Sequence, residues 1–220
     1  MSTTASPKDL IRGFSIDRLL LFSDAVFAIA ITFLAIDIRV PQLPENLIVS
    51  QLNNEILGLA PKFVSFLLTF YIIGSYWINY HRTFSLIKRY DRGLISLNIL
   101  FLMFIVLLPF PNDLIGKYPN QQVSIIIYAF LLAATGSCMG LLWIYASSKY
   151  RLIDKDVNPD FIKHLRIRLF VSPSIFLCSI PFSFLNPLVS IIIWGCAFPV
   201  NFYVERTFRK TKAYITHSES

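Results

Sequence analysis

Apolar residues fill six long stretches of the chain, and polar, charged or proline-containing sequence borders each stretch. A helix needs about 20 mainly apolar residues to cross the roughly 30 Å hydrocarbon core of a bilayer, so each stretch predicts a membrane-spanning helix. The predicted spans are Arg18–Ile38, Leu57–Tyr80, Leu94–Phe110, Val123–Ser147, Leu169–Phe184 and Leu188–Val204. We expect loops between them: residues 39–54 and the polar residues after Pro111 as simple loops, and residues 149–168 as a long charged loop or a short surface helix.

The first span carries an apolar stripe with a single hydroxyl. On a helical wheel of about 100° per residue, the stripe consists of Arg18, Phe22, Ala25, Ile29, Thr32, Phe33 and Ile36. Its spacing leaves two interpretations open: ordinary packing of a buried helix, or a path with hydrophobic constrictions at Ile29, Phe33 and Ile36. The Thr32 hydroxyl is able to contact a partly dehydrated cation or to bond its own backbone.

A second pattern consists of polar residues near one end of the first three spans. Asp24 lies inside the first span, where a carboxylate needs a partner. Trp77 and His81 are four residues apart on one helical face near the same side of the membrane. The predicted polar cluster contains Arg18, Ser23, Asp24, Trp77, His81 and Asn98. This cluster has two possible roles: a clamp that positions the first helix, or a gate or proton sensor, because histidine titrates near physiological pH.

Composition agrees with a membrane protein and argues against a soluble domain. Of the 220 residues, 55% are hydrophobic and 15% are charged, against about 25% charged in soluble domains. The fold class is therefore all-α and polytopic, with a polar segment at 1–17, a six-helix membrane domain at 18–204 and a basic tail at 205–220.

The positive charge, +7 overall, is distributed as an orientation signal. One side of the predicted topology holds 17 of the 20 Lys and Arg residues, and the other holds Arg39, Lys62 and Lys117. By the positive-inside rule both termini face the cytoplasm, which fits six spans in a plasma membrane. The charge therefore gives no reason to expect a nucleic-acid partner.

The sequence contains no recognised enzyme motif. It lacks a glycine-rich phosphate loop, an HExxH motif and the TVGYG filter of common potassium channels. The three cysteines, Cys138, Cys178 and Cys196, lie in apolar runs and are expected to be buried, inert thiols. We expect neither a cofactor nor a resident metal.

The motif Arg18-x-x-x-Phe22-Ser23-Asp24 resembles the signature of the transmembrane protein 175 family of potassium channels, in particular its bacterial branch. The surrounding FSDAVFAIAIT, the WINYHRTF at Trp77–Phe84 and the LPFPNDLIGKY at Leu108–Tyr118 are similar to that branch too. The resemblance runs through all six predicted spans.

This resemblance implies a homotetramer of six-span subunits, a lipid bilayer around it and monovalent cations as permeant partners. It implies that the first helix lines the pore, with its narrowest ring at Ile29, further rings at Phe33 and Ile36, and potassium preference associated with Thr32. Phe33 departs from the family, in which leucine is more typical. The resemblance also implies a polar network that joins Arg18 and Asp24 to Trp77 and His81.

Three functions follow as hypotheses. The first is a passive, potassium-preferring leak channel in a bacterial plasma membrane. The second is a proton-permeable channel or a proton-coupled transporter that uses Asp24 and His81. The third is a non-conducting membrane scaffold whose first helix is simply packed.

Overall fold

The computed structural model describes residues 15–42, 48–195, 200 and 206. Within these residues the fold is all-helical, apart from one isolated β-bridge between Ile87 and Ile153. The helices are α1 (Ile16–Ile36), α2 (Ile48–Gly58), α3 (Ala60–Phe84), α4 (Arg92–Leu107), α5 (Pro109–Lys117), α6 (Gln122–Ser147) and α7 (Pro159–Ser179), with short 3₁₀ turns η2 (Ser148–Tyr150) and η3 (Pro181–Phe184). Residues 187–195 are also helical.

Five segments of the described chain are long and apolar enough to cross a membrane. They are Ile16–Ile36, Gln51–Phe84, Arg92–Lys117, Gln122–Tyr150 and Pro159–Phe184. The sixth predicted span, Leu188–Val204, is helical where it is described, up to residue 195 and at residue 200, and its other residues lie outside the description. The predicted segments 1–17 and 205–220 also lie almost wholly outside it.

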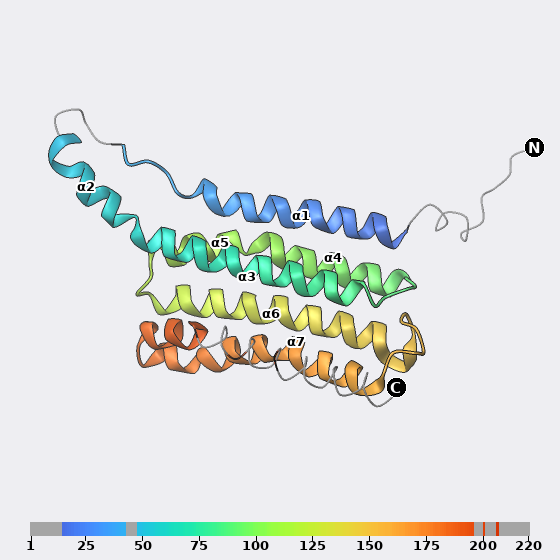
Figure 1. Cartoon of the computed structure of the whole chain (residues 1–220). Helices are drawn as coiled ribbons and strands as arrows, with labels where there is room; N and C mark the ends of the chain where they lie inside the picture. Colours follow the sequence, from blue (N-terminus) through green and yellow to red (C-terminus); the bar gives the residue numbers. More distant parts are fainter. Residues whose placement is uncertain (1–14, 43–47, 196–199, 201–205, 207–220) are drawn as a thin grey trace, which may run out of the picture.

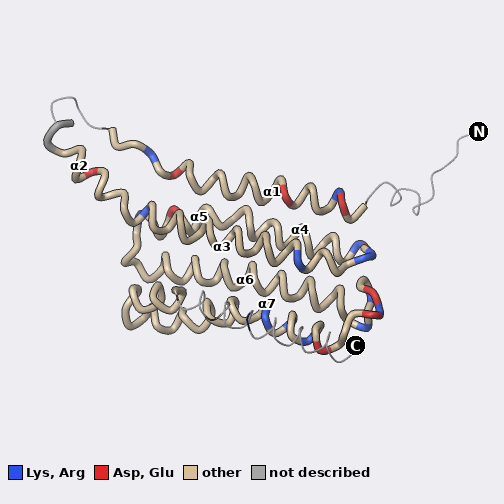
Figure 2. Tube along the Cα trace, in the orientation of Figure 1, with Lys and Arg blue, Asp and Glu red and all other residues tan. Residues whose placement is uncertain are grey.

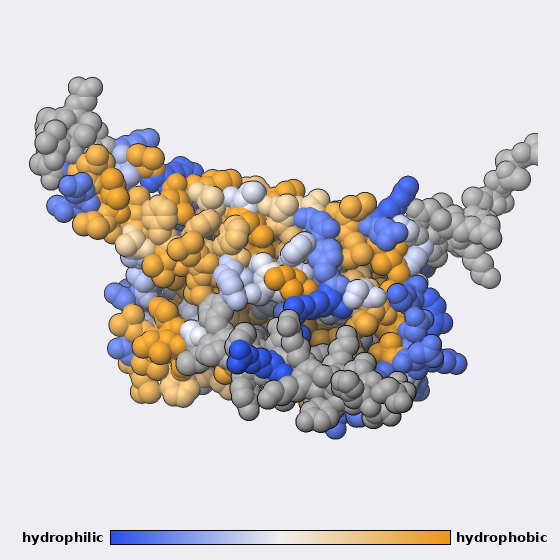
Figure 3. Space-filling view, viewed as in Figure 1, coloured by the Kyte–Doolittle hydropathy of each residue, from blue (hydrophilic) through white to orange (hydrophobic). Residues whose placement is uncertain are grey.

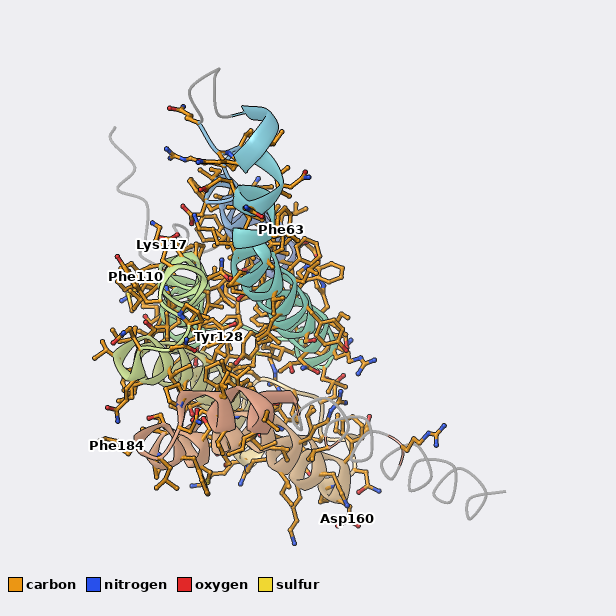
Figure 4. All side chains as sticks on the ribbon, turned by 90° about the vertical axis from the view of Figure 1, so that its left-hand side faces the viewer. Phe63, Phe110, Lys117, Tyr128, Asp160 and Phe184 are labelled. Atoms are coloured by element: carbon orange, nitrogen blue, oxygen red, sulfur yellow. The ribbon has the colours of Figure 1, made fainter. Side chains whose placement is uncertain are left out.

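The helices form a bundle with α6 at its centre (Figure 1). The chain packs α1 against α3, α4 and α5 on one side of the bundle, while α7 packs along α6 on the other. Helix α6 has more buried residues than any other described helix, including Tyr128, Leu132 and Trp143. Tyr128 is labelled in the interior in the end-on view, whereas Phe110 and Phe184 lie at the periphery (Figure 4).

Small residues allow α6 and α7 to approach closely. A Cβ atom on Gly136 would lie 2.6 Å from Cγ of Pro173, and one on Gly140 would lie 2.5 Å from the ring of Phe170. Glycine at these two positions therefore lets the α7 side chains rest on the α6 backbone, a common device in membrane helix pairs.

The predicted loop at residues 39–54 is wrong in its second half, because α2 begins at Ile48. No proline occurs after Pro44 until Pro61, so nothing breaks the helix, and Leu52, Ile56 and Leu59 recur at helical spacing. The second span is correspondingly longer than predicted and continues to Phe84.

The predicted polar loop after Pro111 and the loop at 149–168 are also partly helical. Pro109 lies in the first turn of α5, where a missing N–H costs nothing, so the chain starts a new helix instead of a loop. Asn158 caps α7 by accepting a hydrogen bond from the Asp160 N–H (2.8 Å), and α7 then runs from Pro159 into the membrane segment. Proline and a capping side chain both mark helix starts here.

Basic residues gather at one end of the bundle, where α1 begins and where α3 and α6 end (Figure 2). Between the two ends, apolar residues cover much of the visible surface (Figure 3). This distribution is expected for a chain whose middle lies in hydrocarbon.

At the basic end Asp91 joins three elements. It caps α4 by accepting a hydrogen bond from the Leu94 N–H (2.9 Å), and it accepts another from the Tyr145 hydroxyl (2.9 Å). It also forms an ion pair with Arg151 (2.9 Å). Partial burial raises the pKa of the Asp91 carboxyl, but the hydrogen bonds from Leu94, Tyr145 and Arg151 together outweigh burial, so the pKa lies below its ordinary value.

Candidate functional site

Helix α1 has one face buried in its own subunit and one face outside it. Ser15 caps the helix through a hydrogen bond from the Arg18 N–H to its Oγ (3.2 Å). The buried face consists of Leu19, Ser23, Phe27, Ala30 and Leu34. These residues pack against α3, α4 and α5, so they fix how α1 is rotated about its own axis.

The stripe predicted from the wheel lies on the outer face of α1. Phe22, Ile29, Phe33 and Ile36 are each between 51% and 55% exposed in the subunit. Thr32 is exposed among them, and its hydroxyl donates a hydrogen bond to the Ile29 carbonyl (2.8 Å). The stripe is therefore not covered by its own subunit, and whether it packs on another helix or lines a path depends on what covers it. The stripe needs lipid or another chain to cover it.

Asp24 lies on the flank of α1 and accepts two hydrogen bonds from α3. The indole Nε1–H of Trp77 donates to Asp24 Oδ1 (2.8 Å), and Nε2 of His81 lies 2.8 Å from the same oxygen. Trp77 and His81 are one turn apart, with ring centroids separated by 4.7 Å. The side chains of His81 and Asp24 are 35% and 39% exposed, so the subunit itself covers this cluster only in part.

Ser23 joins a second cluster, which is fully buried. Its hydroxyl lies 2.7 Å from the Tyr80 hydroxyl and accepts a hydrogen bond from Asn98 Nδ2 (3.1 Å). Ser23, Tyr80 and Asn98 are all completely buried. The predicted single polar cluster is therefore two neighbouring clusters: Asp24 with Trp77 and His81, and Ser23 with Tyr80 and Asn98.

Tyr80 is the residue that sequence reasoning missed. It stacks on Phe101 with centroids 5.8 Å apart, and it also contacts Phe27 and Phe84. Its position, one residue before His81 and three after Trp77, places it on the side of α3 that turns toward Ser23. In the sequence it is one of ten tyrosines, and only the three-dimensional arrangement distinguishes it.

Arg18 and Phe22 are not drawn into either cluster within the subunit. Both are exposed. The polar contact that the structure gives Arg18 within its described part is the backbone hydrogen bond to Ser15. These two members of the motif lie on the outer face of α1, together with Ile29 and Ile36.

A third polar group lies nearer the opposite end of the bundle. Thr69 donates a hydrogen bond to Asn112 Oδ1 (2.9 Å), and its hydroxyl lies 2.6 Å from that of Tyr128. These contacts join α3, α5 and α6. They are buried and interior, as expected for polar groups that hold membrane helices together.

The site offers hydrogen-bonding and apolar surface, and it shows no ligand set for a metal. In the described part of the chain no group of three His, Cys, Asp or Glu side chains is placed to hold a metal ion. Of the cysteines, Cys138 is buried as expected, Cys178 is exposed, contrary to expectation, and Cys196 lies outside the described residues. The exposed surface of Cys178 lies on α7, within a predicted span.

Comparisons with known proteins point to one family. A family model described as endosomal/lysosomal potassium channel TMEM175 matches residues 18–109. A potassium channel of Chamaesiphon minutus is 32% identical over 179 residues, which cover 79% of this chain and 87% of that protein. A potassium channel of Streptomyces collinus is also 32% identical, over 67% of this chain and 72% of its own length.

Vertebrate relatives carry a different activity in their names. The endosomal/lysosomal proton channel TMEM175 of Danio rerio is 28% identical over 142 residues, which cover 64% of this chain and 27% of that protein.

Among solved structures, the crystal structure of a lysosomal potassium-selective channel TMEM175 homolog from Chamaesiphon minutus matches with a TM-score of 0.73. The sequence identity is 29%, and the match covers 87% of this chain and 97% of that one.

Proposed function

This chain belongs to the TMEM175 family of ion channels, and on that basis we propose that it is a potassium-preferring leak channel assembled from four copies around a path lined by α1. The protein is a multi-pass membrane channel and not an enzyme. Ion flow through it is passive. The proposed location is a bacterial plasma membrane, with both termini in the cytoplasm.

The exposed face of α1 is the observation that carries this proposal. A half-exposed row of Phe22, Ile29, Phe33 and Ile36 lies outside the buried face of the same helix, about 110° from the centre of that face on the wheel. Four such rows facing a common axis form stacked apolar rings, and apolar rings gate ion paths by controlling whether water enters. Ile29 forms the main constriction in this proposal, with Phe33 and Ile36 as further rings.

The lining supplies no fixed charge along these rings, so its selectivity is weak. The Thr32 hydroxyl donates its proton to the Ile29 carbonyl, which leaves the oxygen lone pairs free to face a passing cation. Thr32 is accordingly the proposed source of the moderate preference for potassium over sodium.

The two polar clusters hold the lining helix in place. Ser23 fixes the buried side of α1 to α3, and Asp24 fixes the flank of α1 to α3. The outer face then keeps a constant rotation toward the axis.

The substitution Ile29→Asn tests the constriction. A polar ring wets more easily, so potassium flux into reconstituted liposomes should rise and the preference over sodium should fall. Ile192→Asn is the matched control, because Ile192 is 69% exposed in helix 187–195, outside α1. Equal flux in wild type and Ile29→Asn would remove Ile29 from the pore.

Proton permeation is the second candidate, favoured by one specific observation. His81 and Asp24 form a hydrogen-bonded, partly exposed pair on the helix that lines the proposed path, on the side that faces α3, and vertebrate relatives are named proton channels. A pH-sensitive dye inside potassium-free liposomes distinguishes the candidates. Acidification that His81→Gln abolishes supports proton flow through the pair, whereas potassium flux without acidification supports the leak channel.

A further inference from the structure

Helix α2 stands clear of the bundle. It meets α3 at their junction, and Figure 1 shows the rest of it rising beyond the outer end of α1. Residues 53–58 are all exposed, including Ile56 at 49% and Leu57 at 71%. A helix with this much apolar surface and so little cover from its own chain needs a partner.

The lengths of α1 and α3 place α2 outside the hydrocarbon. Helix α1 has 21 residues, about 32 Å at 1.5 Å per residue, which matches the hydrocarbon thickness. Helix α3 alone has 25 residues, about 38 Å by the same rise, and α2 is bent away from it beyond the outer end of α1 (Figure 1). The surplus lies at the α2 end, so the apolar side chains of α2 face water unless protein covers them.

The junction between α2 and α3 keeps α2 from lying flat on the membrane. Leu59 has a right-handed helical backbone (φ −80°, ψ −9°). Its N–H bonds to the Ile56 carbonyl and its own carbonyl accepts from the Phe63 N–H, both at 3.1 Å. The chain therefore passes from one helix to the next without a loop that would allow a right-angled turn onto the lipid surface.

Three apolar residues at the end of α2 and its junction with α3 share one side, the stripe of α2, whereas Leu57 points about 130° away from them. Leu52, Ile56 and Leu59 are spaced i, i+4 and i+7, whereas Asn54 lies on the opposite side of the helix. Leu52 and Leu59 are partly covered at present, and Ile56 is half exposed. This pattern is typical of a helix that packs on another helix.

The direction in which α2 rises identifies the partner as a second copy of this chain. It rises on the side of the bundle where α1 lies (Figures 1 and 4), and the outer face of α1 turns away from the bundle on that same side. If α1 surrounds the symmetry axis, α2 stands over the mouth and closer to the axis than the body of its subunit. Copies of α2 are then neighbours.

We propose that the four α2 helices pack against one another through Leu52, Ile56 and Leu59 and form a collar around the outer mouth of the pore. This inference rests on the proposed function, since it requires α1 to line the axis. Glu55 is the one charged residue of α2 and borders the stripe, about 60° from Leu52 on the wheel. In the collar it adds a ring of carboxylates, which raises the local concentration of cations at the mouth.

Cysteine cross-linking tests the collar. Ile56→Cys is introduced into a full-length chain in which Cys138, Cys178 and Cys196 are replaced by alanine, and Asn54→Cys is the matched control on the opposite side of α2. In proteoliposomes treated with a short bis-maleimide, Ile56→Cys should give covalent dimers, the largest product that one cysteine per chain allows, and Asn54→Cys should give several-fold less. Equal cross-linking of both variants, or none at Ile56, overturns the collar.

A fluorophore on the same cysteine separates the collar from a lipid-covered α2. Quenching of a label on Ile56→Cys by nitroxide lipids, without cross-linking, assigns this face to lipid and overturns the collar. Restricted mobility of the label without lipid quenching supports it.

Parallel modification of Ile29→Cys distinguishes failure of the collar from failure of the pore. If a small thiol-reactive cation changes potassium flux through Ile29→Cys while Ile56→Cys stays monomeric, the collar is wrong and the α1 lining stands. If neither variant responds, the axis itself is misassigned and both proposals fall.

Discussion

At the scale of single residues, two adjacent side chains on α1 serve two different environments. Ser23 is completely buried and satisfied by Tyr80 and Asn98, whereas the Asp24 side chain keeps 39% of its surface exposed and faces Trp77 and His81. Adjacent helical positions differ by about 100° in direction, so a serine can enter the core while the next residue stays at its edge. The carboxyl group therefore lies at the edge of the core, and the buried position carries only a hydroxyl.

Ser23→Ala is expected to destabilise the subunit by about 1–2 kcal/mol, because it leaves the hydroxyl of Tyr80 and the amide of Asn98 without their shared partner. Thermal unfolding in detergent measures the loss. Ser96→Ala is the control, since Ser96 is exposed and bonds only its own helix within the described structure, to the Arg92 carbonyl. Equal midpoints for wild type and Ser23→Ala would show that these hydrogen bonds are easily replaced.

At the scale of helices, prolines and glycines decide where elements begin and how closely they pack. Proline at the start of α3, α5 and α7 is compatible with a new helix, because the first turn has no intrahelical acceptor for its missing N–H. Glycine on α6 lets α7 settle against its backbone. Reading each proline as the start of a loop therefore underestimates how much of this chain is helical.

Gly136→Ala is expected to destabilise the packing of α6 on α7 by about 1–3 kcal/mol, because the new methyl group would lie 2.6 Å from the constrained ring of Pro173. Gly74→Ala is the control: a Cβ on Gly74 has no atom within 4 Å, and alanine is favoured in a helix by up to about 1 kcal/mol. Unfolding midpoints of the two variants should move in opposite directions. A stable Gly136→Ala protein would indicate that α7 shifts easily.

Asp91→Asn is expected to lower the free energy of unfolding by about 1 kcal/mol at neutral pH. The asparagine still offers one oxygen to cap α4, but it has no charge and cannot form the ion pair with Arg151. Because the folded-state pKa of Asp91 is lowered, its contribution is complete above its unfolded pKa, near 4, and is lost as pH falls through the folded value. The difference in unfolding midpoint between wild type and variant should therefore shrink below about pH 4. A difference that is constant down to pH 2.5 would contradict this account.

At the scale of the whole molecule, one subunit leaves two apolar surfaces uncovered that lie in different surroundings. In the isolated chain the outer face of α1 is exposed, and on the stripe of α2 Ile56 is exposed while Leu52 and Leu59 are partly covered. Lipid covers an apolar face within the membrane, but in the proposed collar α2 extends beyond it. Assembly around the α1 side covers both surfaces at once, which is why a single arrangement accounts for them.

The assembled particle is expected to contain four chains. Mass photometry or native mass spectrometry after detergent extraction should give a protein mass of four times 25.2 kDa. A dimer as the largest species would require a path formed by two α1 helices and would contradict the fourfold proposal. Measurement at several dilutions separates a stable tetramer from a concentration-dependent association.

The sequence by itself determined the all-helical membrane class, the position of most spans and the pairing of Asp24 with partners from α3. These follow from local quantities: the length of apolar runs, and the four-residue spacing of Trp77 and His81. Helical periodicity also separated the two faces of α1, because it depends only on residue number.

Only the tertiary structure decided which face of α1 is covered by its own subunit, that Tyr80 completes the buried cluster, and that Arg18 lies outside it. A wheel gives relative directions on one helix, but the rotation of that helix against its neighbours depends on contacts between residues far apart in the chain, such as Ser23 with Tyr80 and Asn98. The same holds for α2: its helical spacing was present in the sequence, whereas its position beyond the bundle follows from how α3 is held among α1, α5 and α6.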